Sequence, residues 1–585
     1  MRTFFKTFFA ALLALIVFAL VAGGIILALI SSATQPSKPD IGENGILVID
    51  LSTEFHEQAK ENTVNTFFGD PSADIPGIYD MVRMIHCAKN DASVKGIYVK
   101  ANDNANGFAA SEELRNALLN FKQSKKFVIA YGEAISQRAY YVANAADKIY
   151  CNPLGGVEWD GFSVNLLFLK GLLDKLEIEP QVFYAGKFKS ATEPFRYTKM
   201  SDPNRLQTSA WLDDLYNEFL VQAAEARNVD TATLHQLANT GAIQTANDAL
   251  KYHLVDGLKY DDGVKDELLK LSGKKTSDDI NFITPGKYAA AVDFKTNGDK
   301  KIAIIYAAGD IVSGKGGEDQ IGSDNFVKIL RKARLDDDIK AIVFRVNSPG
   351  GSSLASEAIW REVFLARKVK PVVVSMGDYA ASGGYYISCA ADSVFANPGT
   401  ITGSIGVFSL IPNMQGFFND KLGVTFDGVK TAPFADMPTA SRPLTETEKK
   451  FLQASVDSIY YTFKKRVADG RKKNIDYIDS IAQGRVWTGE RAINIGLIDK
   501  LGTLQNAVDC AARMAKLSSY RTKEYPEKKT LLQELMSESY NSSEKTKAVK
   551  KEVGEKQYKL LVQAKKLQEL IGIPQTKLPF EIEIK

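Results

Sequence analysis

The sequence carries one long segment twice, and this duplication restricts the possible folds more than any other feature. Lys95 aligns with Lys340 and Asn152 aligns with Asn397, and the offset is 245 residues in both cases. The offset stays constant between these positions, so the match reflects an internal repeat and not chance similarity. The chain therefore contains two domains of similar fold.

Matching segments near the repeat ends set the expected domain boundaries. We expect the first repeat over residues 45–270, a linker over 271–299, and the second repeat over 300–517. The total length of 585 residues agrees with this division, because one hydrophobic core rarely supports so long a chain.

Each repeat alternates short β-branched runs with amphipathic helical patterns. In the second repeat, "AIVFRVN" and "PVVVSM" are typical of strands buried on both faces, and "SDNFVKILRKARL" has the spacing of an amphipathic helix. This alternation predicts an α/β fold with a largely parallel sheet. Reactive groups are then expected just beyond the carboxyl ends of the strands.

Two motifs of the second repeat lie at such strand ends. Ser382, in A-A-S-G-G, follows "PVVVSM" by a few residues, and the pair Gly350-Gly351 follows "AIVFRV". Successive glycines let backbone N–H groups approach a ligand closely, which suits the oxyanion formed when a carbonyl is attacked. Each motif alone also fits a structural role, as a tight turn or as close helix packing.

A serine nucleophile needs a base, and the histidines offer none. The chain has four histidines, all before the second repeat, and the G-x-S-x-G motif of α/β-hydrolases is absent. The base is therefore expected to be a residue other than histidine.

The N-terminus carries an apolar run that predicts a membrane anchor over residues 1–33. Residues 7–30 hold no charge and would form a helix about 36 Å long, enough to cross a hydrocarbon core of about 30 Å. Arg2 and Lys6 precede the run, which places the N-terminus in the cytoplasm and the body on the far side. The alternative is a cleaved signal peptide ending near the S-S-A at residues 31–33.

Composition excludes some partners. The 73 basic and 70 acidic residues nearly cancel, which gives no field for binding nucleic acid. The four cysteines are scattered without metal-binding spacing, so no metal is expected.

Four motifs together resemble those of the signal peptide peptidase A (protease IV) family, in its long, duplicated form. The motifs are N-S-P-G-G-S at 347–352, A-S-G-G-Y-Y at 381–386, T-G-S-I-G-V at 402–407 and F-K-S-A-T-E-P-F at 188–195. The resemblance covers about residues 45–517 and the N-terminal apolar run. It implies tandem domains of the Clp-protease/crotonase type and a serine–lysine protease that needs no cofactor.

The resemblance also assigns site residues. It implies that Ser382 is the nucleophile, that Lys189 is the general base, and that backbone N–H groups of the glycines bind the oxyanion, namely Gly350 with its neighbour Gly351, and Gly383. It further implies peptide substrates such as signal-peptide remnants, a homo-oligomer (a tetramer), and a place in the bacterial inner membrane with the body on the periplasmic side.

The repeat alignment supports a composite site independently of the family. Ser382 falls on Gln137 in the first repeat, whereas Lys189 falls on Ala435 in the second. Each half has therefore lost what the other keeps, which predicts one site built from both halves. Three other residues remain as alternatives: Lys187 and Lys430 as bases, and Ser404 as a structural, substrate-lining or nucleophilic hydroxyl.

Residues 518–585 are rich in lysine and predict a charged helical extension, either solvated or in contact with anionic lipid. Two other functions remain open at this point. One is a crotonase-like acyl-CoA enzyme, because that fold also uses glycine oxyanion donors. The other is a non-catalytic membrane scaffold with a protease-like fold.

Overall fold

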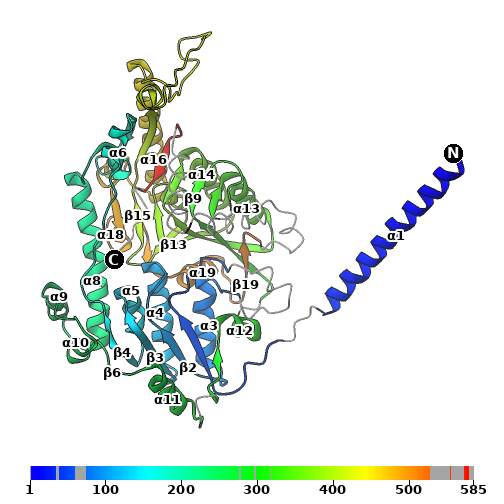
Figure 1. Cartoon of the computed structure of the whole chain (residues 1–585), viewed down its shortest axis with the longest axis vertical. Coiled ribbons are helices and arrows are strands. Elements are labelled where there is room, and N and C mark those ends of the chain that lie inside the picture. Colours follow the sequence, from blue (N-terminus) through cyan, green and yellow to red (C-terminus); the bar gives the residue numbers. More distant parts are fainter. Residues whose placement is uncertain are drawn as a thin grey trace.

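The computed structural model describes residues 2–33, 38–59, 74–275, 279–294, 298–317, 319–527, 554 and 572–578. Two bodies of similar build lie side by side (Figure 1). The first repeat runs from blue through teal to green at its C-terminal end, and the second runs from green to orange. The predicted duplication is confirmed at the level of the sheets, as the strand orders below establish.

The first repeat is built on a parallel six-stranded sheet in the order β6-β4-β3-β2-β1-β7. Its strands are β1 (Gly45–Asp50), β2 (Val94–Lys100), β3 (Phe127–Ile135), β4 (Lys148–Val157), β6 (Gly257–Leu258) and β7 (Phe282–Ile283). The helices α3 (Ile78–Asn90), α4 (Phe108–Lys122), α5 (Gln137–Ala143) and α11 (Asp261–Ser272) pack on it. β7 falls within the expected linker and pairs with β1.

The second repeat has an eight-stranded sheet whose main path is β17-β15-β13-β11-β8-β19, with β14 beside β13 and β18 beside β14. Its strands are β8 (Lys301–Ala308), β11 (Ile339–Ser348), β13 (Val372–Ala381), β14 (Ser393–Ala396), β15 (Ile401–Gly403), β17 (Val486–Thr488), β18 (Lys500–Leu501) and β19 (Arg521–Tyr525). The central parallel order β8-β11-β13-β14 repeats the order β1-β2-β3-β4. This shared order confirms the predicted α/β class.

A third sheet joins the two repeats. Its order is β10-β9-β12-β20-β16-β5, with β5 (Glu179–Ala185), β9 (Asp310–Val312), β10 (Gln320–Gly322), β12 (Gly350–Ser352), β16 (Val407–Asn413) and β20 (Gln575–Lys577). β5 of the first repeat pairs antiparallel with β16 of the second along the whole of both strands, from Val407 opposite Ala185 to Asn413 opposite Glu179. The backbone of one half is thereby fixed against the other.

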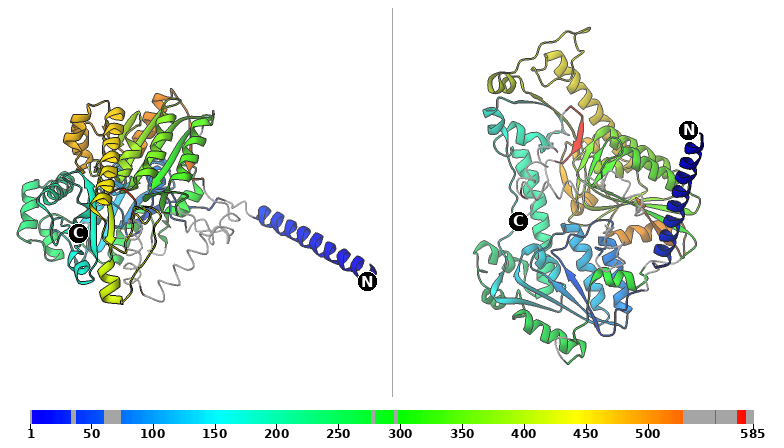
Figure 2. Two further views of the ribbon diagram at one scale, coloured as in Figure 1. Left: turned by 90° about the horizontal axis from the view of Figure 1, so that it is seen from above. Right: turned by 45° about the vertical axis from the view of Figure 1, so that its right-hand side comes forward.

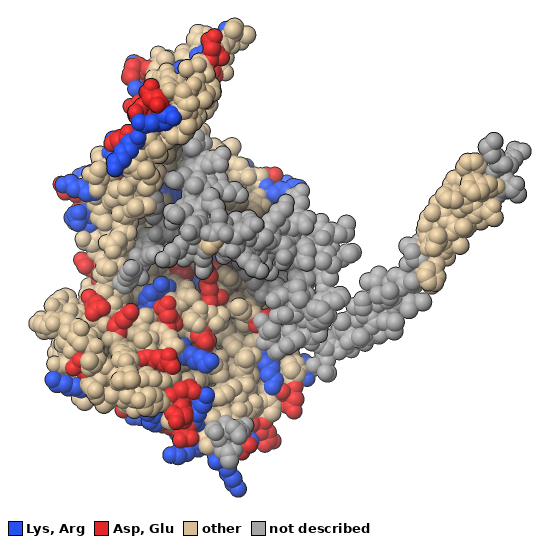
Figure 3. All heavy atoms as spheres, viewed as in Figure 1, with Lys and Arg blue, Asp and Glu red and all other residues tan. Residues whose placement is uncertain are grey.

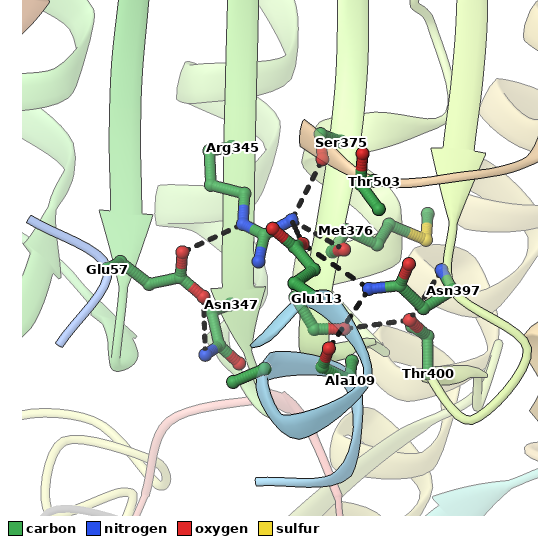
Figure 4. Close-up of polar contacts among 12 residues, drawn as sticks. Glu57, Ala109, Glu113, Arg345, Asn347, Ser375, Met376, Asn397, Thr400 and Thr503 are labelled. Atoms are coloured by element: carbon green, nitrogen blue, oxygen red, sulfur yellow. Dashed lines mark hydrogen bonds and ion pairs between the residues drawn. The ribbon is translucent and has the colours of Figure 1, made fainter. Parts of the chain in front are cut away.

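A buried ionic cluster lies between the repeats (Figure 4). The guanidinium of Arg345, on β11, donates from Nε to Glu57 Oε2 at 2.8 Å and contacts Glu113 Oε1 through Nη1 at 3.0 Å. Both carboxylates belong to the first repeat, and Asn347 donates to the second oxygen of Glu57 at 2.9 Å. Burial alone would lower the pKa of Arg345, but Glu113 and Glu57 outweigh it and raise that pKa. Removing Arg345 would leave both carboxylates buried without their cationic partner, at a cost of about 3–5 kcal/mol.

Asp378, near the end of β13, extends this contact between the halves. Its Oδ1 accepts hydrogen bonds from the amides of Ala109 and Ala110 in the first turn of α4, at 2.8 and 3.2 Å. Burial, with the nearby Glu57 carboxylate, raises the pKa of Asp378. The strand that leads to Ser382 is therefore held from the first repeat as well as from its own sheet.

The N-terminal helix α1 (Arg2–Ala33) stands apart from both repeats in Figure 1 and in the left view of Figure 2. Its described side chains include exposed Phe8, Leu13 and Phe18, and the side in view in Figure 3 shows only uncharged residues among those described. The side chains of residues 22–33, the second half of the expected anchor, lie outside the described residues. Across the part of the chain that is described, no helix proves long and apolar enough to cross a membrane.

The expected helical extension over residues 518–585 falls largely outside the described residues. Its described parts include two strands, β19 and β20. β19 pairs in parallel with β8, and so extends the sheet of the second repeat past the expected boundary at residue 517.

Candidate active site

Ser382 lies at a sharp turn between β13 and the short helix α15 (Gly383–Ser388). It is fully buried and has φ +55°, a left-handed conformation that non-glycine residues seldom adopt. Its amide donates to the carbonyl of Gly403 at 2.8 Å, which holds the turn. A Cβ at Gly384 would lie 2.6 Å from the carbonyl oxygen of Ser348, so the small residues after the serine are required by close packing. Strained turns of this kind concentrate at functional sites.

Lys189 of the first repeat reaches the hydroxyl of Ser382. Its Nζ lies 2.8 Å from Ser382 Oγ, 3.1 Å from Ser404 Oγ and 3.3 Å from the carbonyl oxygen of Ser404. Only 2% of Lys189 is exposed. Burial lowers the pKa of its ammonium group well below the usual value of about 10.4. Among the described residues, no carboxylate forms an ion pair with Lys189 to offset this effect.

Backbone hydrogen bonds hold the segment that carries Lys189 against the second repeat. The residue lies four positions after β5, which is already paired with β16, and the amide of Phe188 donates to the carbonyl of Gln483 at 2.7 Å. Two glycines of the second repeat make room for the side chain. A Cβ at Gly484 would lie 2.7 Å from Cβ of Lys189, and one at Gly406 would lie 3.1 Å from its Cδ.

The glycines expected at the oxyanion site meet beside Ser382. Gly350, at φ +104°, lies so close to Gly383 that a Cβ on it would be 2.7 Å from the Gly383 amide nitrogen. The Gly350 amide donates to Ser348 Oγ at 3.1 Å. Gly351 lies one position further along β12, opposite Thr576 of β20. The structure therefore brings all five sequence-predicted residues into one region.

The two alternative lysines are both exposed. Lys187 lies two positions before Lys189 with its Nζ over the ring of Phe188, and Lys430 is paired with Asp436 at 2.7 Å. Ser404, considered above for several roles, is buried against Lys189. Two residues that make room for Lys189 were not singled out from the sequence: Gly406, which lies within the T-G-S-I-G-V motif, and Gly484, which lies outside the four motifs.

The position in the first repeat that corresponds to Ser382 has become structural. Gln137 Oε1 accepts from the amides of Asp160 and Gly161 at 3.1 and 3.0 Å, and its Nε2 donates to the carbonyl of Gly161 at 2.9 Å. All these contacts stabilise a local loop. Within the described residues, no cluster of His, Cys, Asp or Glu is arranged to hold a metal ion.

Comparison with known proteins identifies the family. The model of "Peptidase family S49" matches the chain twice, over residues 120–275 and 365–518. The chain belongs to peptidase family S49. The two matches fall one in each repeat, so the family domain is present in duplicate, and the predicted serine protease function is confirmed in preference to an acyl-CoA enzyme or a scaffold.

Relatives of this S49 peptidase match most of its length. "Protease 4" of Salmonella typhi is 39% identical over 470 residues, which cover 78% of this chain and 75% of that protein. "Protease 4" of Haemophilus influenzae is 36% identical over 453 residues, which cover 74% and 72%. Among solved structures, the ClpP1 N165D mutant from Listeria monocytogenes is matched at 14% identity with a TM-score of 0.24, over 35% of this chain and 94% of that one.

The packing of Gly484 against Lys189 yields a prediction. We expect Gly484→Ala to lower kcat of the S49 peptidase by about tenfold or more, because the new methyl group displaces the lysine and small misplacements are costly in catalysis. Gly423→Ala is the matched control, since Gly423 has a similar φ (+67°, against +72° for Gly484) but nothing within 4 Å of its Cβ position. Steady-state peptide hydrolysis by both variants is the measurement. Equal kcat values would show that Gly484 does not position Lys189.

Proposed function

We propose that the protein is a Ser-Lys endopeptidase whose single site is shared between its two repeats. Ser382 is the nucleophile, Lys189 the general base, and the amides of Gly350 and Gly383, with Gly351 beside them, form the oxyanion site. The observation that carries this proposal is the 2.8 Å hydrogen bond between Lys189 Nζ and Ser382 Oγ across the repeats. The family membership supports it, because an S49 peptidase requires a serine nucleophile and an activating group.

The chemistry follows from the state of the lysine. A buried amine with a lowered pKa is neutral at moderate pH and accepts a proton. Lys189 takes the proton of Ser382 as Oγ bonds to the peptide carbonyl carbon, and it then gives that proton to the departing amine as the C–N bond breaks. Water releases the acyl group by the same route in reverse. Ser404 orients Lys189 by contacts with Nζ from both its hydroxyl and its carbonyl.

Glycines suit the oxyanion role because the backbone itself must face the substrate. At φ +104° Gly350 adopts a conformation that side chains rarely allow, and the close contact with Gly383 leaves no room for a Cβ. Two adjacent amides in a buried site stabilise developing negative charge far better than water does. The Gly350 amide would then exchange its present partner, Ser348 Oγ, for the oxyanion.

We further propose apolar peptides such as signal-peptide remnants as substrates, and a bacterial inner-membrane location with the body on the periplasmic side. The support is the apolar surface of α1, which stands apart from the body with Phe8, Leu13 and Phe18 exposed. A homo-oligomer is proposed on the family resemblance alone.

The membrane proposal predicts that the full chain sediments with membranes after an alkaline carbonate wash. A chain that begins at residue 38 should be released, because apolar burial in lipid, worth about 0.8 kcal/mol per CH₂ group, would be lost. Immunoblots of pellet and supernatant make the comparison. Release of the full chain would contradict the membrane proposal and leave the catalytic proposal unaffected.

If the site is composite, the nucleophile and base should act as a unit. We expect Ser382→Ala and Lys189→Ala each to lower kcat/KM by about 10³-fold or more, and the double variant to be scarcely worse. Lys187→Ala and Lys430→Ala are matched controls, since both lysines are exposed whereas Lys189 is buried. Peptide hydrolysis with circular dichroism as a folding check is the measurement. Substantial turnover by Ser382→Ala would move the nucleophile elsewhere, with Ser404 next.

The lowered pKa of Lys189 predicts the pH dependence. Below that pKa the ammonium form cannot accept the serine proton, so kcat/KM should rise with pH and level off above it. Lys189→Arg should be inactive across the whole range, because a guanidinium stays protonated. A wild-type profile that falls through neutral pH would exclude a neutral lysine as base.

A further inference from the structure

A short strand far along the chain lies beside the glycines of the proposed oxyanion site. β20 pairs antiparallel with β12, which places Lys577 opposite Gly350 and Thr576 opposite Gly351. On its other edge Gln575 of β20 pairs with Phe408 of β16. β20, the small red strand in Figure 1, therefore fills the space between β12 and β16 in the middle of the third sheet.

β20 contacts its neighbours as an extended peptide does when it binds to the edge of a sheet. The amide of Leu578 donates to the carbonyl of Pro349 at 2.8 Å, and Thr576 Oγ1 donates to the carbonyl of Gly351 at 3.0 Å. Lys577 Nζ forms an ion pair with Asp310 at 2.7 Å. Main-chain pairing along a sheet edge, with alternate side chains in pockets, is how many proteins bind extended peptides.

Leu578 enters an apolar pocket next to the nucleophile. It is 3% exposed and packs in a cluster with Trp211, Leu215, Ala381, Ile401 and Val486. Ala381 directly precedes Ser382, and the Pro349 carbonyl that holds the Leu578 amide belongs to the same peptide group as the N–H of Gly350. Trp211 and Leu215 of this pocket belong to helix α8 (Asp202–Arg227) of the first repeat. Both repeats therefore contribute residues to the pocket, as they do to the Ser382–Lys189 pair.

These contacts bring Leu578 beside Pro349 and against Ala381, the residue that precedes Ser382. Resting on the proposed function, we infer that residues 572–578 act as an intramolecular pseudosubstrate that blocks the groove, with Leu578 at the position just before the scissile bond.

The residue after Leu578 explains why this strand resists cleavage. It is Pro579, so the bond at the scissile position is a tertiary amide, and the proline ring crowds the residue before it. A strand that carries Leu-Pro at this point binds as a substrate does and resists acylation. It blocks the site without being consumed.

The first experiment measures access to the nucleophile in the full chain. A fluorophosphonate probe should label Ser382 about tenfold faster in Leu578→Asp than in the wild type, because a carboxylate disfavours the apolar pocket and the groove opens. Ile573→Asp is the matched control, since it adds the same charge to the same segment at a side chain that is 46% exposed. Equal rates in all three chains would overturn the inference alone. Absence of labelling in every chain would overturn the Ser382 assignment and the inference with it.

The second experiment tests whether Leu578 lies at the scissile position. It leaves β20 bound in the groove. In Pro579→Ala, Ser382 Oγ attacks the carbonyl carbon of Leu578, the C–N bond to residue 579 breaks, and the serine proton passes through Lys189 to the departing amine. Water then hydrolyses the ester. Mass spectrometry should find loss of the segment that begins at residue 579 in Pro579→Ala, and no loss in the wild type or in Pro579→Ala with Ser382→Ala. An intact Pro579→Ala chain would overturn the placement of Leu578 at the scissile position.

Discussion

The antiparallel pairing of β5 with β16 is the constraint on which the rest of the site depends. Along the whole length of both strands, backbone hydrogen bonds fix the first repeat against the second, and Lys189 follows four positions after β5. If only side chains joined the domains, Lys189 could move out of hydrogen-bonding distance of Ser382. A shared sheet sets the position of Lys189 by the same geometry that sets neighbouring strands within one domain.

The buried cluster around Arg345 gives the interface its specificity. Glu57 and Glu113 of the first repeat can be paired only when the second repeat supplies the guanidinium (Figure 4). A misaligned interface would bury uncompensated charge, which costs several kcal/mol and is therefore strongly disfavoured. Asp378 adds a contact between the repeats close to Ser382. Its carboxyl oxygen accepts a hydrogen bond from the amide of Ala109 in α4, and its strand leads into the strained turn at Ser382.

Much of this arrangement was predictable from sequence, and the remainder was not for physical reasons. The repeat offset and the buried strands leave patterns in the sequence, so the fold class follows from them. The candidate dyad came from the resemblance to the peptidase family, and the repeat alignment added that Ser382 and Lys189 each lack a counterpart in the other repeat. Arg345 stands within a run predicted to be a buried strand, but nothing in the sequence shows that its partners are Glu57 and Glu113 of the other repeat. β20 spans three residues, too few for any periodicity, and its pairing with β12 joins positions more than 200 residues apart. The need for a glycine at position 484 likewise becomes evident only when Lys189 is seen packed against it.

If the site is shared between the repeats as proposed, that division also determines when the protein can first become active. Residue 189 leaves the ribosome well before residue 382, so the proposed base has no nucleophile beside it until both repeats have folded and paired. The strand partner of β5 appears later still, at residues 407–413. On this proposal a newly made first repeat cannot cleave the chains around it, and proteolytic activity begins only when both repeats have assembled correctly.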